Sequence, residues 1–418
     1  MSRGSSLFFH ADFRRLWAGD TASQFGTAVG YTAVPLLAAV TLAATPFEMG
    51  LLTAAETAAF LLLGLPAGVW VDRLRRRRVM LTADFVRFAL LLSVPLAWWA
   101  GVLTLAQLVV VMLFVGMATV FFDVAYQSYL PSLVGREHLL EGNAKLQAVQ
   151  SVAQVAGPSG AGLLVQLISA ASTVLVTAFG YLTSALCLLR IRAAEPAPEP
   201  TGHPRLRQQI AEGLRFVFSD KPLRSSVACT ATANLFGGAF VAVQVLFFTR
   251  TVGLSPALVG VMLAIGGAGG ILGAVFSGAL TRRIGHARTI WLVPLLSWPA
   301  HLLLPWTGAD WRLVLAAVGE VGYGFGVIVY NVAQVSYRQA ICPDRLLGRM
   351  NASVRFLVWG TLPLGGLLGG TLGETLGLRG AVWVAAAGEA AAALWVVCSP
   401  LRKMRDLPVT EKAGATTA

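Results

Sequence analysis

Acidic residues that interrupt long apolar stretches are the side chains of this sequence best suited to chemistry. Asp20, Asp123 and Glu320 each stand inside such a stretch, beside other polar residues. Inserting a charged side chain at the middle of a bilayer costs on the order of 3 kcal/mol on insertion scales. The presence of such a residue must therefore be explained by an ion pair, by contact with water or by a function. A carboxylate in a dehydrated cavity can bind a proton from one side and release it to the other. We expect one of these three acids to carry such a proton, or else to pair with a buried arginine and fix helix register.

Helical spacing groups further polar residues with these acids. Gln24, Thr27 and Tyr31 follow Asp20 at intervals of four, three and four residues, which places all four on one helix face. We expect this face to look into a cavity. The candidates for proton coupling or for cavity lining are Asp20, Gln24, Tyr31, Glu56, Asp123, Gln127, Gln150, Gln154, Asn234, Gln244, Glu320, Asn331 and Arg355, and Glu389 completes the set of acids inside apolar blocks.

Two arginines inside apolar blocks, Arg87 and Arg355, are expected to be buried cations. Asp84 lies three residues before Arg87, so the two side chains can pair on one face of a helix. We therefore interpret Asp84 and Arg87 as a structural ion pair.

The composition indicates a membrane protein and argues against most soluble classes. Hydrophobic residues make up 56% of the 418 positions and charged residues 12%, whereas soluble domains carry roughly a quarter charged residues. The net charge of +12 lies in short basic loops rather than along one helix face, so no nucleic-acid partner is expected. The four cysteines and five histidines show no metal-binding spacing, so no metal site is predicted.

Apolar blocks of about 20 residues predict membrane-spanning helices. Twelve such blocks start near residues 16, 48, 79, 104, 143, 170, 223, 255, 289, 312, 346 and 378. Arginine is concentrated in one alternate set of loops, which by the positive-inside rule puts both termini in the cytoplasm of a multi-pass cell (plasma or inner) membrane protein. The expected units are a six-helix bundle at 1–192, a cytoplasmic linker with an interfacial helix at 193–222, a second six-helix bundle at 223–400 and a cytoplasmic tail at 401–418.

The two halves of the sequence resemble each other at a constant offset. Gly157 in the first half corresponds to Gly365 in the second, and Gly162 corresponds to Gly370. Because each half holds an even number of spans, both copies have the same orientation in the membrane, which is a parallel repeat. We predict an all-α polytopic membrane protein in which two pseudo-symmetric six-helix bundles enclose a central cavity.

The loop after the second apolar block, GVWVDRLRRRR, resembles the GxxxDRxGR[RK] loop of the major facilitator superfamily. The resemblance implies the major facilitator fold and a cytoplasmic gate formed by Gly68, Asp72, Arg73, Arg76 and Arg77. We expect Gly68 to let two helices approach closely and Asp72 to pair with an arginine of a neighbouring helix. Arg75 stands where the family usually has glycine, and Arg282 replaces the aspartate in the second copy of the loop.

The fifth apolar block carries AQVAGPSGAG, which resembles the GxxxGPxxGG motif of proton-coupled exporters in the same superfamily. Gly157, Pro158 and Gly162 match the motif, while Ala153 and Ala161 replace glycines. Proline frees a backbone carbonyl and bends a helix, and small residues permit close packing. The three matching residues are expected to act as a hinge or seal, with a plain packing seam as the alternative.

Further short matches at residues 13–17, 130–134 and 211–224 are similar to the branch of the superfamily that contains enterobactin exporters and macrolide-efflux proteins. This resemblance covers residues 13 to about 400. It implies alternating-access efflux of an amphiphilic antibiotic, siderophore or secondary metabolite, driven by proton antiport.

We expect a monomer, in contact with membrane lipid, that is not an enzyme and needs no cofactor beyond a proton gradient. The sequence has no GxxxxGK[ST] loop, so ATP is not indicated as the energy source. A lipid (lysophospholipid) transporter of the same fold is the first alternative. A membrane receptor or membrane-bound enzyme is the second.

Overall fold

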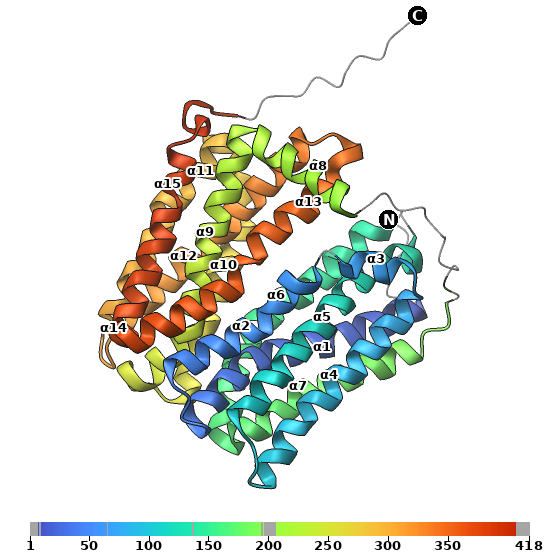
Figure 1. The fold of residues 1–418 in the computed structure, drawn as a ribbon, viewed down its shortest axis with the longest axis vertical. Helices are drawn as coiled ribbons and strands as arrows, with labels where there is room; N and C mark the ends of the chain where they lie inside the picture. Colours follow the sequence, from blue (N-terminus) through green and yellow to red (C-terminus); the bar gives the residue numbers. More distant parts are fainter. Residues whose placement is uncertain are drawn as a thin grey trace, which may run out of the picture.

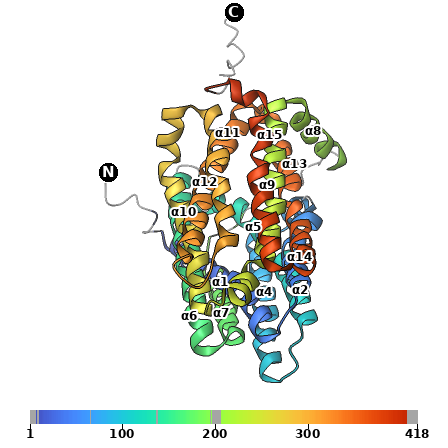
Figure 2. The same cartoon turned by 90° about the vertical axis from the view of Figure 1, so that its left-hand side faces the viewer.

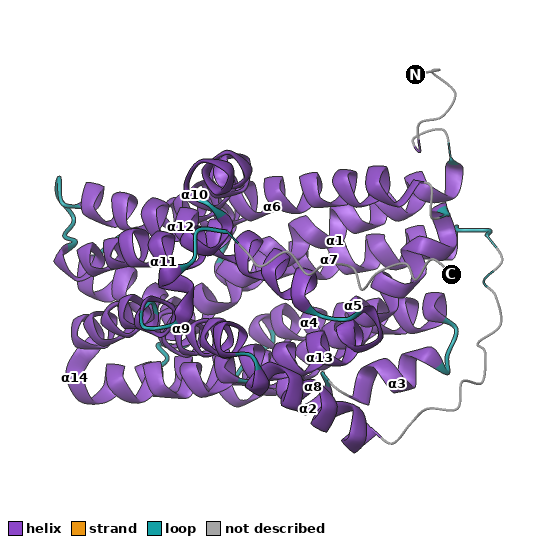
Figure 3. Cartoon of the chain, turned by 90° about the horizontal axis from the view of Figure 1, so that it is seen from above, coloured by secondary structure: helices purple, strands orange, loops and turns teal. Residues whose placement is uncertain are grey.

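The computed structural model describes residues 7, 10–64, 66–135, 138–193, 195 and 206–406. Within these residues the chain forms helices and no strand, and Figure 3 shows the helices joined by loops. Residues 194 and 196–205 of the expected linker, and the tail after residue 406, lie outside the described residues. The boundaries of those two units therefore stay predictions.

The first half of the chain contributes the helices α1 (Ala11–Leu36), α2 (Pro46–Leu63), α3 (Pro66–Asp72), α4 (Arg76–Trp99), α5 (Leu105–Val134), α6 (Leu139–Ile168) and α7 (Ala170–Leu189). The second half contributes α8 (Leu206–Ser219), α9 (Lys221–Leu246), α10 (Pro256–Ile284), α11 (His286–Ser297), the 3-10 helix η5 (Trp298–Trp306), α12 (Leu313–Ile341), α13 (Asp344–Trp359), α14 (Thr361–Ala392) and α15 (Leu394–Val397). The helix α8 packs against α13, where Glu212 pairs with Arg349.

Among the described residues, nine helices are long and apolar enough to cross a membrane. Three features explain why this count is below the twelve predicted spans. The helix α1 carries polar residues along its length, and α11 is short and continues as η5. The window Arg349–Val397 holds two legs that meet at Gly377, whose positive φ of 73° favours glycine. The arrangement is consistent with twelve spans, and the chain is a multi-pass membrane protein.

The two halves share local irregularities as well as sequence. The helix α1 ends in a π-helical turn, η2 (Leu37–Thr41), and α9 ends in another, η4 (Phe247–Val252). In both halves the next helix begins with a proline, Pro46 in α2 and Pro256 in α10, after a hydroxyl residue that caps it. Figure 1 shows the two halves as separate bundles, which overlap in the turned view of Figure 2. With the shared irregularities, this confirms the pseudo-symmetric fold predicted from the repeat.

The two bundles contact each other at one end of the molecule, which we call the closed end. Gly162 of α6 lies against α10, where a Cβ on Gly162 would be 3.0 Å from the Gly260 Cα. Gly370 of α14 lies against α2, where a Cβ would be 3.0 Å from the Gly50 Cα. Small residues are what allow helix backbones to approach this closely. Because Gly162 and Gly370 correspond in the repeat, the two contacts are related by the pseudo-symmetry.

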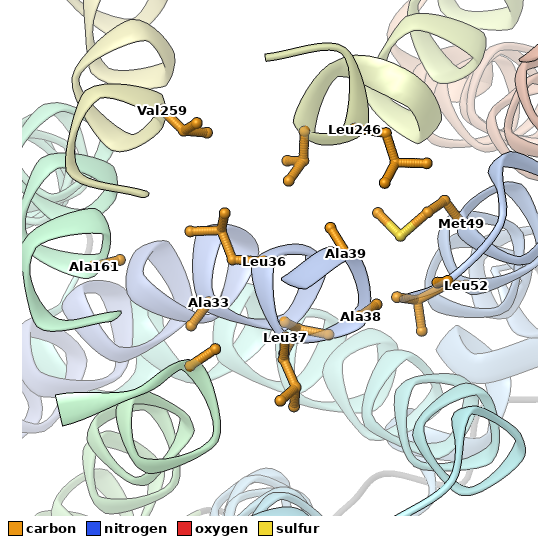
Figure 4. Close-up of a cluster of buried hydrophobic side chains, with 14 of the residues drawn as sticks. Ala33, Leu36, Leu37, Ala38, Ala39, Met49, Leu52, Ala161, Leu246 and Val259 are labelled. Atoms are coloured by element: carbon orange, nitrogen blue, oxygen red, sulfur yellow. The ribbon is translucent and has the colours of Figure 1, made fainter. Parts of the chain in front are cut away.

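Apolar side chains complete the closure beside these glycines (Figure 4). One buried cluster draws on both halves and includes Leu36, Met49, Leu246 and Val259. The hydrocarbon side chains of this cluster fill the space between the interior of the molecule and its closed end. At the opposite end, which we call the open end, Figure 1 shows α9 and α13 of the second half diverging from the helices of the first half.

Candidate functional site: a central cavity and two buried ionic clusters

Three adjoining spaces form what we call the central cavity, and two of them are lined by residues of both halves. The largest, about 620 Å³, lies among α9, α12 and α13. The second, about 280 Å³, lies between α13 and the first-half helices α2 and α5. The third, about 160 Å³, lies nearer the closed end, among α1, α2, α5 and α9. The first two share Asn351, Arg355 and Trp359, and the last two share Phe60.

Most of the polar residues that the sequence nominated line the central cavity. They are Tyr31, Glu56, Asp123, Gln127, Asn234, Gln244, Asn331 and Arg355. Gln24, Gln150 and Gln154 are not among the residues that line these three spaces. Asp20 and Glu320 are 4% and 8% exposed and lie within the helix packing.

Opposite charges face the same part of the central cavity from the two halves. Asp123 of α5 and Arg355 of α13 both line the 280 Å³ space. The Arg355 guanidinium carbon lies 4.7 Å from the Trp359 ring centroid. The Phe60 ring packs edge-on against the Trp359 ring, with the two centroids 4.6 Å apart. The prediction that Arg355 is buried is wrong: its side chain is exposed, because α13 stands away from the first half at the open end. The cavity therefore offers a carboxylate, a guanidinium and aromatic rings to a ligand.

The predicted polar face of α1 reaches the cavity only in part. Thr27 and Tyr31 line the 160 Å³ space. Asp20 instead interacts with Gln24 and Tyr126 in the packed part of the bundle. The first turns of α1 are enclosed by α6 and α7, which explains why helical phase alone misplaced Asp20.

A buried ion pair stands behind the cavity in the first half. Asp84 and Arg87, both on α4, are in direct ionic contact and are 0% and 3% exposed. The Arg87 guanidinium carbon lies 4.3 Å from the Phe122 ring centroid and 4.1 Å from that of Tyr181. Aromatic faces stabilise a desolvated guanidinium. The pair predicted from the three-residue spacing is confirmed.

A second buried group, in the second half, is assembled from three segments far apart in the sequence. His301 of η5 is bonded through Nδ1 to Oε2 of Glu389 on α14, at 2.5 Å. His301 Nε2 lies 3.8 Å from Oε2 of Glu320 on α12. The side chains of His301, Glu389 and Glu320 are 2%, 1% and 11% exposed. We call these three residues the acid–histidine cluster.

A break in the eleventh helix places His301 in this cluster. The α-helix α11 ends at Ser297, and the chain continues as the 3-10 helix η5, which contains Pro299 and Pro305. Proline has no amide hydrogen to continue an α-helix, and a 3-10 helix is tighter. The changed phase turns His301 towards α12 and α14, where its ring stacks on Tyr323 with the centroids 3.9 Å apart.

Sequence reasoning named Glu320 as a site candidate but missed His301 and the way Glu389 is used. The histidines were judged by metal-ligand spacing alone, and by that standard they are scattered. The signal that could have found the cluster is simpler: His301, Glu320 and Glu389 are ionisable residues inside apolar blocks, and each needs a partner there. Within the described residues, no group of side chains is arranged to hold a metal ion.

The loop expected to form a cytoplasmic gate is hydrogen-bonded to other residues of the first half. Backbone amides of Arg76 and Arg77 donate to the Glu195 carboxylate at 2.5 and 3.2 Å. The Arg77 guanidinium donates to two carbonyl oxygens at the end of α7, at 2.9 and 2.8 Å. A Cβ on Gly68 would meet no atom within 4 Å, so the close helix approach predicted there is wrong for this conformation, in which the bundles are apart. The Asp72 side chain is outside the described residues.

The exporter-like motif of α6 lies at the closed end. A Cβ on Gly157 would be 2.4 Å from the Ala28 side chain, so this glycine allows α6 to pack on α1. Further along, a Cβ on Gly260 would be 2.3 Å from the Pro158 carbonyl oxygen. With Gly162, the motif therefore contributes both to packing within the first half and to the contact between halves.

Known proteins share both the sequence pattern and the fold. A family model described as Major Facilitator Superfamily matches residues 16–360. The multidrug efflux pump Tap of Mycobacterium tuberculosis is 29% identical over 355 residues, which cover 82% of this chain and 80% of that protein. The enterobactin exporter EntS of Escherichia coli is 26% identical over 358 residues, with coverage of 83% and 82%.

Solved structures resemble the fold at lower identity. The nucleoside transporter NupG has a TM-score of 0.74 and 13% identity, covering 94% of this chain and 99% of that one. A bacterial homologue of the iron transporter ferroportin, in an inward-facing state, has a TM-score of 0.72 and 15% identity, with coverage of 94% and 99%. At these identities the likeness concerns the fold alone.

Proposed function

The chain belongs to the Major Facilitator Superfamily, and we propose that it exports amphiphilic small molecules from the cytoplasm by proton antiport. Proteins named as a multidrug efflux pump and as an enterobactin exporter are similar to it over about four fifths of its length, 82% and 83%. On this proposal the substrate is moved unchanged, without enzymatic conversion, and the energy comes from a proton gradient.

The observation that carries the proposal is the composition of the central cavity. Its walls combine the apolar and aromatic surfaces of Phe60 and Trp359 with the charges of Asp123 and Arg355. Ligand sites for organic molecules typically have mostly apolar walls and a few polar groups that fix orientation. An amphiphile can place its hydrophobic part against the rings and a charged or polar group near either ionic side chain.

The two ends of the molecule support alternating access. The glycine contacts and apolar cluster shut the closed end, while the cavity reaches towards the open end. On the orientation expected from the arginine-rich loops, the open end faces the cytoplasm, so this conformation is ready to receive a substrate from inside. Rocking of the two bundles about the cavity would then expose it to the other side.

Accumulation of ethidium, a macrolide and a catecholate siderophore in cells that express the protein tests the proposal. We expect less accumulation than in control cells, and we expect a protonophore to abolish the difference. Asp123→Asn and Arg355→Gln should each weaken export of charged members of the panel, while Glu374→Gln, an exposed acid on α14, should not. Equal accumulation with and without the protein, across a panel extended to labelled lysophospholipid, would contradict small-molecule export.

Export of labelled lysophospholipid alone would replace the proposed substrate class with lipid. Export that persists when the protonophore has collapsed the gradient would leave export in place and remove proton antiport.

A further inference from the structure

We propose that the acid–histidine cluster is the proton-exchange site that drives transport, physically separate from the substrate cavity. The inference rests on the proposed proton antiport and adds the residues that bind the proton. It places the coupling proton at His301, Glu389 and Glu320, rather than at Asp20 or Asp123.

The first argument is the charge balance of the cluster. The ion pairs that the structure gives for Glu320 and Glu389 both go to His301. One imidazolium and two carboxylates carry a net charge of −1, and one added proton makes the group neutral. Two carboxylates that share one partner in a desolvated site favour holding a proton between them. The cluster is therefore built to gain and lose a single proton.

The second argument is geometry. The His301 ring is fixed by its bond to Glu389 and by stacking on Tyr323. Its other nitrogen, Nε2, has no hydrogen-bond partner within the described part of the chain, and Oε2 of Glu320 lies 3.8 Å from it. A shift of about 1 Å would bring these atoms to hydrogen-bonding distance. When the ring is neutral, with its proton on Nδ1, a proton on Glu320 can pass to Nε2 while the Nδ1 proton moves to Glu389, and the net charge of −1 does not change.

Among the described residues, the groups that act on the cluster include no permanent cation that would prevent this exchange. From α12 the cluster meets Tyr323, whose hydroxyl interacts with Glu389, and from α9 it meets Phe240 and, through Tyr323, the thiol of Cys229. The helix α10 approaches it with Gly266, and α9 approaches Glu389 with Gly237. Glu320, at 11% exposure, is the most accessible member and the natural entry point for the proton.

The third argument is the connection from the cluster to the contact between halves. A Cβ on Gly266 of α10 would be 2.8 Å from Glu320 Oε2, and a Cβ on the next residue, Gly267, would be 3.0 Å from the Gln154 carbonyl oxygen of α6. One turn of α10 thus touches the cluster on one side and the first half on the other. Glu389 lies on the leg of α14 after the kink at Gly377, whereas Gly370, which contacts α2 at the closed end, lies on the leg before it. A proton that changes the packing of the cluster therefore acts most directly on the contact that α10 makes with the first half.

The test follows the conformation as a function of pH, and it needs no substrate. Spin labels at Ser132→Cys on α5 and Gln339→Cys on α12, exposed positions near the open end, report the distance between the bundles. The background carries Cys187→Ala and Cys398→Ala, and the protein is in lipid nanodiscs. We expect the parent distance distribution to change between low and high pH, and we expect Glu389→Gln and His301→Gln each to abolish the change.

Controls separate loss of the site from loss of the fold. Glu374→Gln removes an exposed acid from the same helix as Glu389 and should keep the pH response. Glu389→Gln preserves shape and one hydrogen bond to His301, and its thermal midpoint in detergent should stay close to that of the parent. In proteoliposomes it should lose proton-driven ethidium transport roughly tenfold or more, while ethidium exchange, which needs no net proton movement, stays near the parent rate.

Several results would overturn the inference. A parent protein whose label distances do not respond to pH, or a response that survives in both Glu389→Gln and His301→Gln, contradicts a proton site at the cluster. Failure of the proposed function can be told apart from failure of this inference. In that case the parent protein does not export ethidium, macrolide or siderophore from cells, whatever the label distances show. If Glu389→Gln retains protonophore-sensitive export, the proton site proposed at the cluster is wrong, and the proposed function stands.

Discussion

The two bundles each bury an ionic pair, and the two pairs differ in the cation. Arg87 in the first half lies in contact with Asp84 and is covered by two aromatic rings, and a guanidinium is in general a permanent cation. His301 in the second half lies beside two carboxylates, and an imidazole can exist as a neutral base as well as a cation. The first arrangement has one stable charge state, whereas the second has several.

This difference separates a structural role from a working one. A permanent cation opposite a buried carboxylate holds α4 and its neighbours in register, and no proton is needed to balance it. A titratable cation between two acids on different helices changes its bonds when a proton arrives. On our proposal, the first half therefore has a fixed ionic pair, and the second half of the pseudo-symmetric fold contains the proton site.

The largest effect is expected when the fixed pair is broken. Arg87→Met leaves Asp84 buried without its cation, which costs about 3 kcal/mol or more. Little monodisperse protein should be recovered, with a sharply lower thermal midpoint by scanning fluorimetry. The double variant Asp84→Asn/Arg87→Met removes both charges and should recover most of the loss, because the two changes share one interaction. Equal damage in the single and double variants would show that the charge pairing is not what holds this region.

The next effect distinguishes the two acids of the acid–histidine cluster. Glu389 bonds His301 at 2.5 Å, whereas Glu320 stands 3.8 Å from it. We expect Glu389→Gln to remove pH-gradient-driven transport and Glu320→Gln to slow it less, since Glu320 serves as the entry point. Initial rates of ethidium transport in proteoliposomes, with quantities of folded protein matched, measure the order. The reverse order would move the central role to Glu320.

A smaller effect is expected at the glycine that touches the cluster. A methyl group at Gly266 would meet Glu320 Oε2 at 2.8 Å, and the flexible carboxylate can yield. Gly266→Ala should therefore leave the thermal midpoint nearly unchanged but displace Glu320 from His301 and shift the pH midpoint of the label-distance change. Ala268→Gly, a small change two residues along α10, is the matched control. An unchanged pH midpoint in Gly266→Ala would argue against a role for this contact.

The smallest effect is expected at an exposed ion pair. Asp310 and Arg312 pair at 3.0 Å in a loop, with side chains 48% and 46% exposed. Hydrogen bonding from Arg312 holds the pKa of the Asp310 carboxyl below its usual range. Such a carboxylate contributes stability above its unfolded pKa of about 3.9 and loses it as the pH falls further. Since exposed pairs contribute little, Asp310→Asn should not change the thermal midpoint at neutral pH. A clear drop would mean that exposed and buried pairs in this protein differ less than we infer.

The sequence was most informative where structure depends on local spacing or on repeats. The pair of Asp84 and Arg87 follows from a three-residue interval, and the closed-end contacts of Gly162 and Gly370 follow from a motif and its repeated copy. Both signals survive because helix geometry converts sequence distance directly into spatial distance. Much of the cavity lining could be nominated for the same reason, as Asn331 of α12 illustrates.

What could not be predicted depends on how distant segments pack. The acid–histidine cluster joins residues 301, 320 and 389, and its formation requires the 3-10 segment that turns His301 inwards. Arg355 was expected to be buried and is exposed, because exposure there depends on the separation of the bundles. Gly68 was expected to mark a close helix contact, and that expectation failed for the same conformational reason. Helical periodicity carries no information about which state an alternating-access protein adopts.

Proton release on substrate binding is the most direct test of the division between the two bundles. Purified protein in weakly buffered detergent solution would receive ethidium while a pH indicator records protons released per protein. We predict release by the parent and by Asp84→Asn/Arg87→Met, and none by Glu389→Gln with ethidium binding retained. Release that persists in Glu389→Gln, or that disappears only in the Asp84→Asn/Arg87→Met variant, would contradict the assignment of the coupling proton to the second half.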